Sequence, residues 1–184
     1  FKYDRDRFLS IIIFMVLPGV LSASLLVNSA IMVTFFTLLY LYFFNKEKKH
    51  SYVLLFLYLF IDNSFAILYF AIFLFSLKSK DKKILITSLV LFSLSMYIYG
   101  FESAGKPKGY FLDTFAIYST IFSPLLFVYF VYTIYRAGVK NEKTLTWYIS
   151  STALLLSLIF SLRQRIYIED YAPYVVISLP YMLK

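Results

Sequence analysis

Long apolar runs alternate with short clusters of charged residues along the whole of this chain. The charged residues gather at 1–7, 45–50, 78–83, 102–113, 136–143 and 163–170. A helix needs about 20 apolar residues to cross the roughly 30 Å hydrocarbon core of a bilayer. Several of the intervening runs approach that length, and none has the polar face of a soluble helix. The sequence therefore predicts an all-α fold, a polytopic bundle of transmembrane helices.

The amino-acid composition also favours a transmembrane protein. Hydrophobic residues make up 61% of the chain and charged residues only 15%, whereas about a quarter of a soluble domain is charged. Buried helices of a soluble protein are the alternative, but they would need more polar surface elsewhere than this chain has. The net charge of +8 does not indicate a nucleic-acid partner, because the basic residues sit in short loops between apolar runs. Membrane lipid is the expected surrounding partner, and the sequence does not identify protein partners.

We expect a single transmembrane domain over 1–184. Its spans are predicted at about 8–25, 29–44, 52–77, 84–99, 114–135, 144–162 and 171–184. Phe8–Phe44 is divided because one helix of that length would measure about 55 Å, and Pro18-Gly19 and Asn28-Ser29 supply a break and a turn. The sequence begins with Phe1 rather than Met and stops at Lys184 inside an apolar run, so we expect it to be a fragment of a larger membrane protein.

The basic residues set the expected orientation. Thirteen Lys and Arg residues lie in 1–7, 45–50, 78–83 and 136–143, against four in 102–113 and 163–170. Short cytoplasmic loops carry the excess of Lys and Arg. We therefore expect the first group of loops to be cytoplasmic and the second to be extracytoplasmic.

Segment 52–77 has two interpretations. Its flanking basic loops both favour the cytoplasm, yet the 26 residues of Tyr52–Leu77 are too few for two crossings, which need about 40. A re-entrant hairpin turning at Asp62-Asn63-Ser64 reconciles these facts, and we favour it over one long tilted helix. Asp62 is then either a functional carboxylate at membrane depth or part of the turn.

Four cations lie on the side that normally avoids them, and they define the candidate site: Lys106, Lys108, Arg163 and Arg165. Tyr110, Tyr167 and Tyr171 add hydroxyl donors to the same loops. Arg suits phosphate through its planar fork, and Lys acts as a point charge. One interpretation is a site for the phosphate of a lipid carrier. The other is plain charge balance by Glu102, Asp113, Glu169 and Asp170. We interpret His50, the only histidine, as solvated and functionless.

Two stretches resemble the GT-C glycosyltransferases, in particular the protein O-mannosyltransferases and the aminoarabinose transferases that modify lipid A. Gly105-Lys106-Pro107-Lys108-Gly109-Tyr110, followed by a span with Ser123-Pro124, resembles the Pro-x-x-Tyr loop of that group and its mid-helix Pro. Arg163-Gln164-Arg165, Tyr171-Ala172-Pro173 and Leu179-Pro180 resemble its basic-x-x-Tyr-x-x-Pro-x-x-Pro stretch. Upstream, Pro18 through Phe35-Phe36 is similar to its hairpin.

The resemblance implies a sugar donor on a polyprenyl phosphate, inverting transfer and an active site on the extracytoplasmic face. It places Tyr110 near the donor phosphate and matches Arg163 or Arg165 to the basic residue of the final stretch. It also suggests a bacterial inner membrane. The catalytic carboxylate of the group would lie upstream of Phe1, so no catalytic residue is assigned. No cofactor or metal site is visible, and ligands of any divalent ion are expected upstream as well.

The chain also departs from the group. Asn28-Ser29-Ala30 stands where an Asp often follows a basic residue, and Asp62-Asn63-Ser64 replaces a Lys-Gly hairpin. These differences leave two alternatives open. One is a structural or lipid-binding membrane subunit without chemistry. The other is a transporter or flippase, supported by Asp62 and by spans broken at Pro18 and Pro124.

Overall fold

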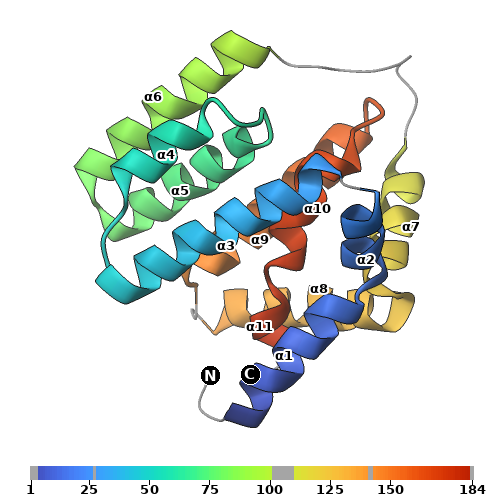
Figure 1. The fold of residues 1–184 in the computed structure, drawn as a ribbon. Coiled ribbons are helices and arrows are strands. Elements are labelled where there is room, and N and C mark those ends of the chain that lie inside the picture. The colour runs from blue at the N-terminus through green and yellow to red at the C-terminus, as the bar shows by residue number, and fades with distance from the viewer. Residues whose placement is uncertain (1–3, 27, 101–109, 141–142, 183–184) are drawn as a thin grey trace.

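The computed structural model describes residues 4–26, 28–100, 110–140 and 143–182, and every regular element in these ranges is a helix (Figure 1). The helices are α1 (Asp4–Val16), α2 (Pro18–Leu25), α3 (Ser29–Glu47), α4 (Tyr52–Tyr58), α5 (Phe65–Ser79), α6 (Lys82–Tyr99), α7 (Phe111–Phe122), α8 (Pro124–Val139), α9 (Leu145–Ser161), α10 (Ile168–Val176) and α11 (Leu179–Met182). The all-α prediction is thus confirmed for the described residues. By length and composition, α3 and α6 can each cross a membrane, and two bent helix pairs raise the number to as many as four.

Two predicted spans are bent rather than straight. The axis turns by 56° between α1 and α2 and by 103° between α7 and α8. Each break immediately precedes a proline, Pro18 or Pro124. Proline lacks the N–H of the helix ladder and disfavours a helical conformation in the residue before it. At Ser123 the backbone leaves the helix with φ +71°, so neither 8–25 nor 114–135 is one straight helix.

Segment 52–77 folds back on itself. The hydroxyl of Tyr69 on α5 donates a 2.8 Å hydrogen bond to the carbonyl oxygen of Leu55 on α4, although a continuous helix would separate these residues by about 21 Å. The rings of Tyr58 and Phe65 stack across the turn with centroids 4.7 Å apart. In Figure 1, α4 and α5 run in opposite directions and α6 returns beside α5. The single long helix is therefore excluded.

Asp62 builds the turn of this hairpin. Its Oδ1 accepts a 2.8 Å hydrogen bond from the Ser64 backbone N–H and a second one from the Ser64 hydroxyl. A side chain that bonds the backbone two residues onward is a typical turn device of Asp. Of the two roles expected for Asp62, the structure supports the turn.

The loops gather at two ends of the helix bundle. At one end the Tyr99 hydroxyl bonds the Leu59 carbonyl oxygen at 3.2 Å, and the Tyr110 backbone N–H bonds the Ser161 carbonyl oxygen at 2.8 Å. This end, which among the described residues includes 59–64, 99–100, 110 and 161–170, is called the cation-poor end below. Residues 45–51, 78–83, 140 and 143–144 lie at the other end, called the basic end, where Phe75 contacts both His50 and Tyr148.

Segment 171–184, predicted to begin a span, forms two short helices in its described part. The first, α10, already starts at Ile168 and ends at Val176, and α11 follows at Leu179. The α10 residues from Pro173 to Val176 are buried, because α10 packs against α9 and α3. The start of α10 lies at the cation-poor end, and the helix then continues into the bundle against α9 and α3.

Candidate functional site

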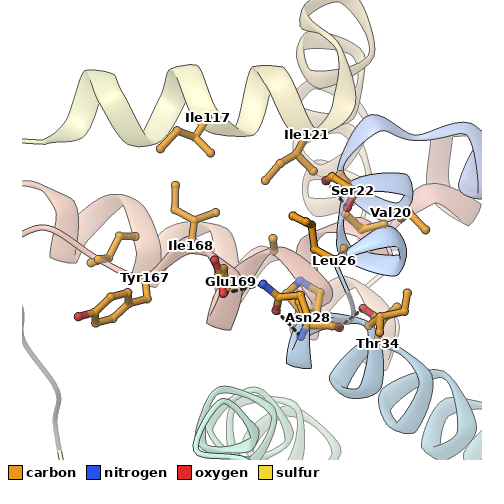
Figure 2. A pocket seen from close by; sticks show the side chains of 18 of the residues that line it. Val20, Ser22, Leu26, Asn28, Thr34, Ile117, Ile121, Tyr167, Ile168 and Glu169 are labelled. Atoms are coloured by element: carbon orange, nitrogen blue, oxygen red, sulfur yellow. Dashed lines mark hydrogen bonds between the residues drawn. The ribbon is translucent and has the colours of Figure 1, made fainter.

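A cavity of about 590 Å³ lies at the cation-poor end between α2, α3, α7 and α10 (Figure 2). Its walls are largely apolar and include Val20, Leu26, Ile117, Ile121 and Ile168. The polar side chains in its lining are Ser22, Asn28, Thr34, Arg165, Tyr167 and Glu169. The volume is in the range of ligand pockets, which are mostly apolar with a few well-placed polar groups.

Asn28 enters the cavity because it caps α3. Its Oδ1 accepts the Ala30 backbone N–H at 2.9 Å, which satisfies one of the free donors at the helix start. Its Nδ2 then donates a 2.8 Å hydrogen bond to Oε2 of Glu169. Figure 2 shows the two side chains pointing toward one another. The capping hydrogen bond thus orients the Asn28 amide, which in turn binds the Glu169 carboxylate.

Gly19 lets α2 approach α7 closely at the cavity wall. A Cβ at position 19 would lie 2.5 Å from Cγ2 of Ile121 and 3.1 Å from its Cβ. Ile121 is β-branched and stiff at χ1, so it has little freedom to yield. The small residue at position 19 therefore sets the distance between these two helices.

A second cavity of about 290 Å³ opens between α5, α6, α9 and the start of α10. Asn63, Ser64, Asp170 and Tyr171 contribute its polar side chains. The Ser64 hydroxyl lies 3.2 Å from Oδ1 of Asp170, which links the hairpin turn to α10. Glu169 lines the first cavity and Asp170 the second, so the first turn of α10 separates them.

Only some of the predicted site residues line a cavity in the structure. Arg165 lines the first cavity and Tyr171 lines the second. Arg163 is exposed and lines neither cavity. Tyr110 precedes α7 and lines neither cavity, although its backbone ties α7 to the end of α9. Lys106 and Lys108 lie outside the described residues.

Asn28 and Glu169, the hydrogen-bonded pair of the first cavity, were not predicted as site residues. The sequence indicated Asn28 only as part of a turn and Glu169 only as a balancing charge. The sequence offers two local signals for them. Asn28 is a polar residue at a sharp turn between apolar runs, and Glu169 is a carboxylate in a loop predicted to be extracytoplasmic. No local signal shows that residues 141 positions apart meet.

His50 differs from the prediction because it is partly buried at the basic end. The Tyr40 hydroxyl and Nδ1 of His50 share a 2.5 Å hydrogen bond. The centroids of the Phe44 and His50 rings lie 4.7 Å apart. Burial lowers the pKa of His50 below its usual value, and the nearby charge of Asp81 offsets part of this effect. The interpretation of His50 as solvated is therefore wrong.

The first cavity combines an apolar interior with a cation, a carboxylate and an amide at one end of the molecule. Such a lining suits an amphipathic ligand with an anionic, hydroxyl-bearing head. Among the described residues, no group of three or more His, Cys, Asp or Glu side chains is placed to hold a metal ion.

No protein family matches this chain, and comparisons with curated proteins and with solved structures give no significant match.

Proposed function

We propose that this chain acts in a membrane glycosyltransferase of the GT-C type. It would take a sugar from a polyprenyl phosphate at the extracytoplasmic face, in the inner membrane of a bacterium. The observation that carries the proposal is Arg165, a cation that lines a mainly apolar cavity at the cation-poor end. The resemblance in the sequence points to the same loop.

A polytopic arrangement in the membrane is supported by the surface of the molecule. Large apolar side chains are exposed on several helices, among them Leu25 at 81%, Leu112 at 78% and Leu125 at 86%. Exposed apolar patches of this kind mark contact with a membrane or another protein. The grouping of the basic loops at one end agrees with the expected orientation, in which that end faces the cytoplasm.

The lining of the first cavity fits a lipid phosphate. The guanidinium of Arg165 offers a planar fork of donors that matches phosphate oxygens. The side chains of Val20, Ile117 and Ile121 provide apolar contact for the first isoprene units. In transfer, the phosphate leaves the sugar with its negative charge, and a cation placed beside it stabilises that charge as it develops.

The proposal leaves the base unassigned. Deprotonation of the acceptor needs a carboxylate within hydrogen-bond reach of its hydroxyl or amine. No residue of 1–184 matches the catalytic carboxylate of the group that the sequence resembles, so no residue is named for this role. Tyr110, Lys106 and Lys108 stay proposed contacts of the donor phosphate on the strength of the resemblance alone.

A lipid-binding membrane subunit without chemistry is the second candidate, because the same cavity suits it equally well. The two functions differ in sugar transfer, which the glycosyltransferase would catalyse and the lipid-binding subunit would not. The transporter alternative relies on Asp62 as a functional carboxylate, and the hydrogen bonds that Asp62 makes within the turn weaken its main support.

The decisive experiment compares Arg165→Gln with Arg163→Gln in the full-length protein. The two arginines lie two residues apart, but only Arg165 lines the cavity. We expect Arg165→Gln to lower transfer from a polyprenyl-phosphate sugar by about 100-fold, as loss of a donor to a developing charge does, and Arg163→Gln to have little effect. Equal activity of the two variants would contradict the role of Arg165. Lipid binding without any turnover in the wild type would favour the subunit.

A further inference from the structure

The polar side of the first cavity contains a hydrogen-bonded pair that the binding of a phosphate does not use. Asn28 and Glu169 both line the cavity, and they are joined by the 2.8 Å bond between Nδ2 and Oε2. The Glu169 carboxylate does not suit a phosphate, because it repels an anion, and it occupies one hydrogen of the Asn28 amide. The pair therefore needs a different ligand group.

The hydrogen-bonding capacity of the pair is specific. An amide nitrogen carries two hydrogens and a carboxylate carries two acceptor oxygens. After their mutual bond, Asn28 keeps one N–H donor and Glu169 keeps one full acceptor oxygen beside it. A donor and a charged acceptor side by side match two neighbouring hydroxyl groups, of which one donates to the carboxylate and the other accepts from the amide.

The pair is also held in place before a ligand arrives. Asn28 is fixed by its 2.9 Å bond to the Ala30 backbone N–H at the start of α3. Glu169 is exposed and lies in the first turn of α10, a helix that is anchored by its buried residues from Pro173 to Val176, which pack against α9 and α3. A site on rigid elements loses little entropy when it binds.

We propose that Asn28 and Glu169 bind a vicinal diol of the donor sugar and thereby select the sugar that the cavity accepts. Arg165, which lines the same cavity, holds the phosphate that links this sugar to the lipid. This inference rests on the proposed function and assigns its specificity to two named side chains.

The test measures binding of farnesyl phosphate and of its mannosyl and glucosyl esters to the purified full chain in detergent. We expect the wild type to bind one of the two hexosyl esters about tenfold or more tightly than farnesyl phosphate, which is the effect of one or two charge-assisted hydrogen bonds. Glu169→Gln replaces an acceptor oxygen by a donor of nearly equal size. It should abolish the preference for the hexosyl ester, whereas farnesyl phosphate should bind at least as tightly as to the wild type, because the substitution removes a negative charge from the cavity.

Asn28→Asp is the second variant, because it keeps the oxygen that caps α3 and removes the amide donor. It too should remove the preference for the hexosyl ester. Asp113→Asn is the matched control, since Asp113 is an acidic residue in the first turn of α7 that does not line the cavity. The control should keep the full preference.

The outcomes separate this inference from the proposed function. If farnesyl phosphate binds but neither ester binds more tightly, or if Glu169→Gln and Asn28→Asp both keep the preference, the inference is overturned alone. If farnesyl phosphate does not bind in the wild type, the proposed function fails and the inference fails with it.

Discussion

The hydroxyl of Tyr69 on α5 donates a 2.8 Å hydrogen bond to the carbonyl oxygen of Leu55 on α4. The bond joins the two arms of the hairpin whose turn is built by Asp62 and Ser64. Tyr69 is fully buried, so no solvent is available to replace its hydroxyl as the partner of Leu55. A polar contact inside an apolar core therefore helps to hold the two arms of the hairpin together.

We expect Tyr69→Phe to lower the free energy of unfolding by about 1–3 kcal/mol, because it leaves a buried carbonyl oxygen unsatisfied. Thermal unfolding of the protein in detergent measures the change. Tyr97→Phe is the matched control, since Tyr97 is 88% exposed and its substitution should be nearly neutral. An equal loss in both variants would show that the Leu55 contact is not responsible.

Gly19→Ala should destabilise the packing of α2 against α7. The added Cβ meets Ile121, and overpacking of this kind costs about 1–3 kcal/mol, which exceeds the gain of about 1 kcal/mol in helix propensity. A net loss of about 1 kcal/mol is expected in the same unfolding assay. Ser24→Ala on the exposed side of α2 is the control. A Gly19→Ala variant as stable as the control would show that α2 can move away from α7 without cost.

Ser123→Gly should stabilise the fold. The Ser123 backbone has φ +71° and ψ 146°, close to a region in which a residue other than glycine costs about 1–3 kcal/mol. Glycine relieves that strain, so we expect a gain of about 1 kcal/mol. Ser123→Ala removes the hydroxyl but keeps the Cβ and should bring no gain. If both variants change stability equally, the hydroxyl rather than the backbone is responsible.

Stability should fall on mild acidification because of His50. Burial lowers its pKa in the folded state from an unfolded value of about 6.5. The unfolded chain therefore binds more protons just below that pH, and stability is full above it and declines as pH falls toward the folded pKa. Protonation of Nδ1 would also prevent it from accepting a hydrogen bond from Tyr40.

The measurement is the unfolding temperature between about pH 7.5 and 5.5, above the range in which ordinary carboxylates titrate. His50→Gln should flatten the profile, since His50 is the only histidine in the sequence. A decline of the same size in the variant would assign the pH dependence to other groups.

The expected orientation can be measured by cysteine labelling, because the sequence contains no cysteine. Single cysteines at Lys49 on the basic end and at Arg163 on the cation-poor end replace exposed residues. In intact cells, a membrane-impermeant maleimide should label the Arg163→Cys variant directly. It should label the Lys49→Cys variant only after permeabilisation. Labelling of both variants from outside would contradict the polytopic arrangement.

Much of the helix pattern could be predicted from the sequence. The apolar run that becomes α6 was predicted at 84–99 and forms Lys82–Tyr99, and the run predicted at 144–162 forms Leu145–Ser161. The breaks at Pro18 and Pro124 were also visible. Their angles were not, because proline marks where a helix is interrupted but packing decides how far the chain turns.

The candidate site was less accessible to sequence reasoning. Arg163 and Arg165 are equivalent as residues in one short loop, and only the path of that loop places Arg165 in the cavity. Glu169 and Asp170 are adjacent, yet a rotation of about 100° per residue along a helix sends them to different cavities. His50 was interpreted as solvated because nothing in its neighbouring sequence reveals the contacts with Tyr40 and Phe44 that partly bury it.

The sequence by itself determined what is local: apolar length, helix breaks and the distribution of positive charge among the loops. These properties follow from hydropathy and backbone geometry, which act over a few turns of chain. Only the tertiary structure decided that Asn28 meets Glu169, that Tyr69 reaches Leu55 and that α10 divides two cavities. Such contacts depend on how whole helices pack, and packing is a property of surfaces that distant segments form together.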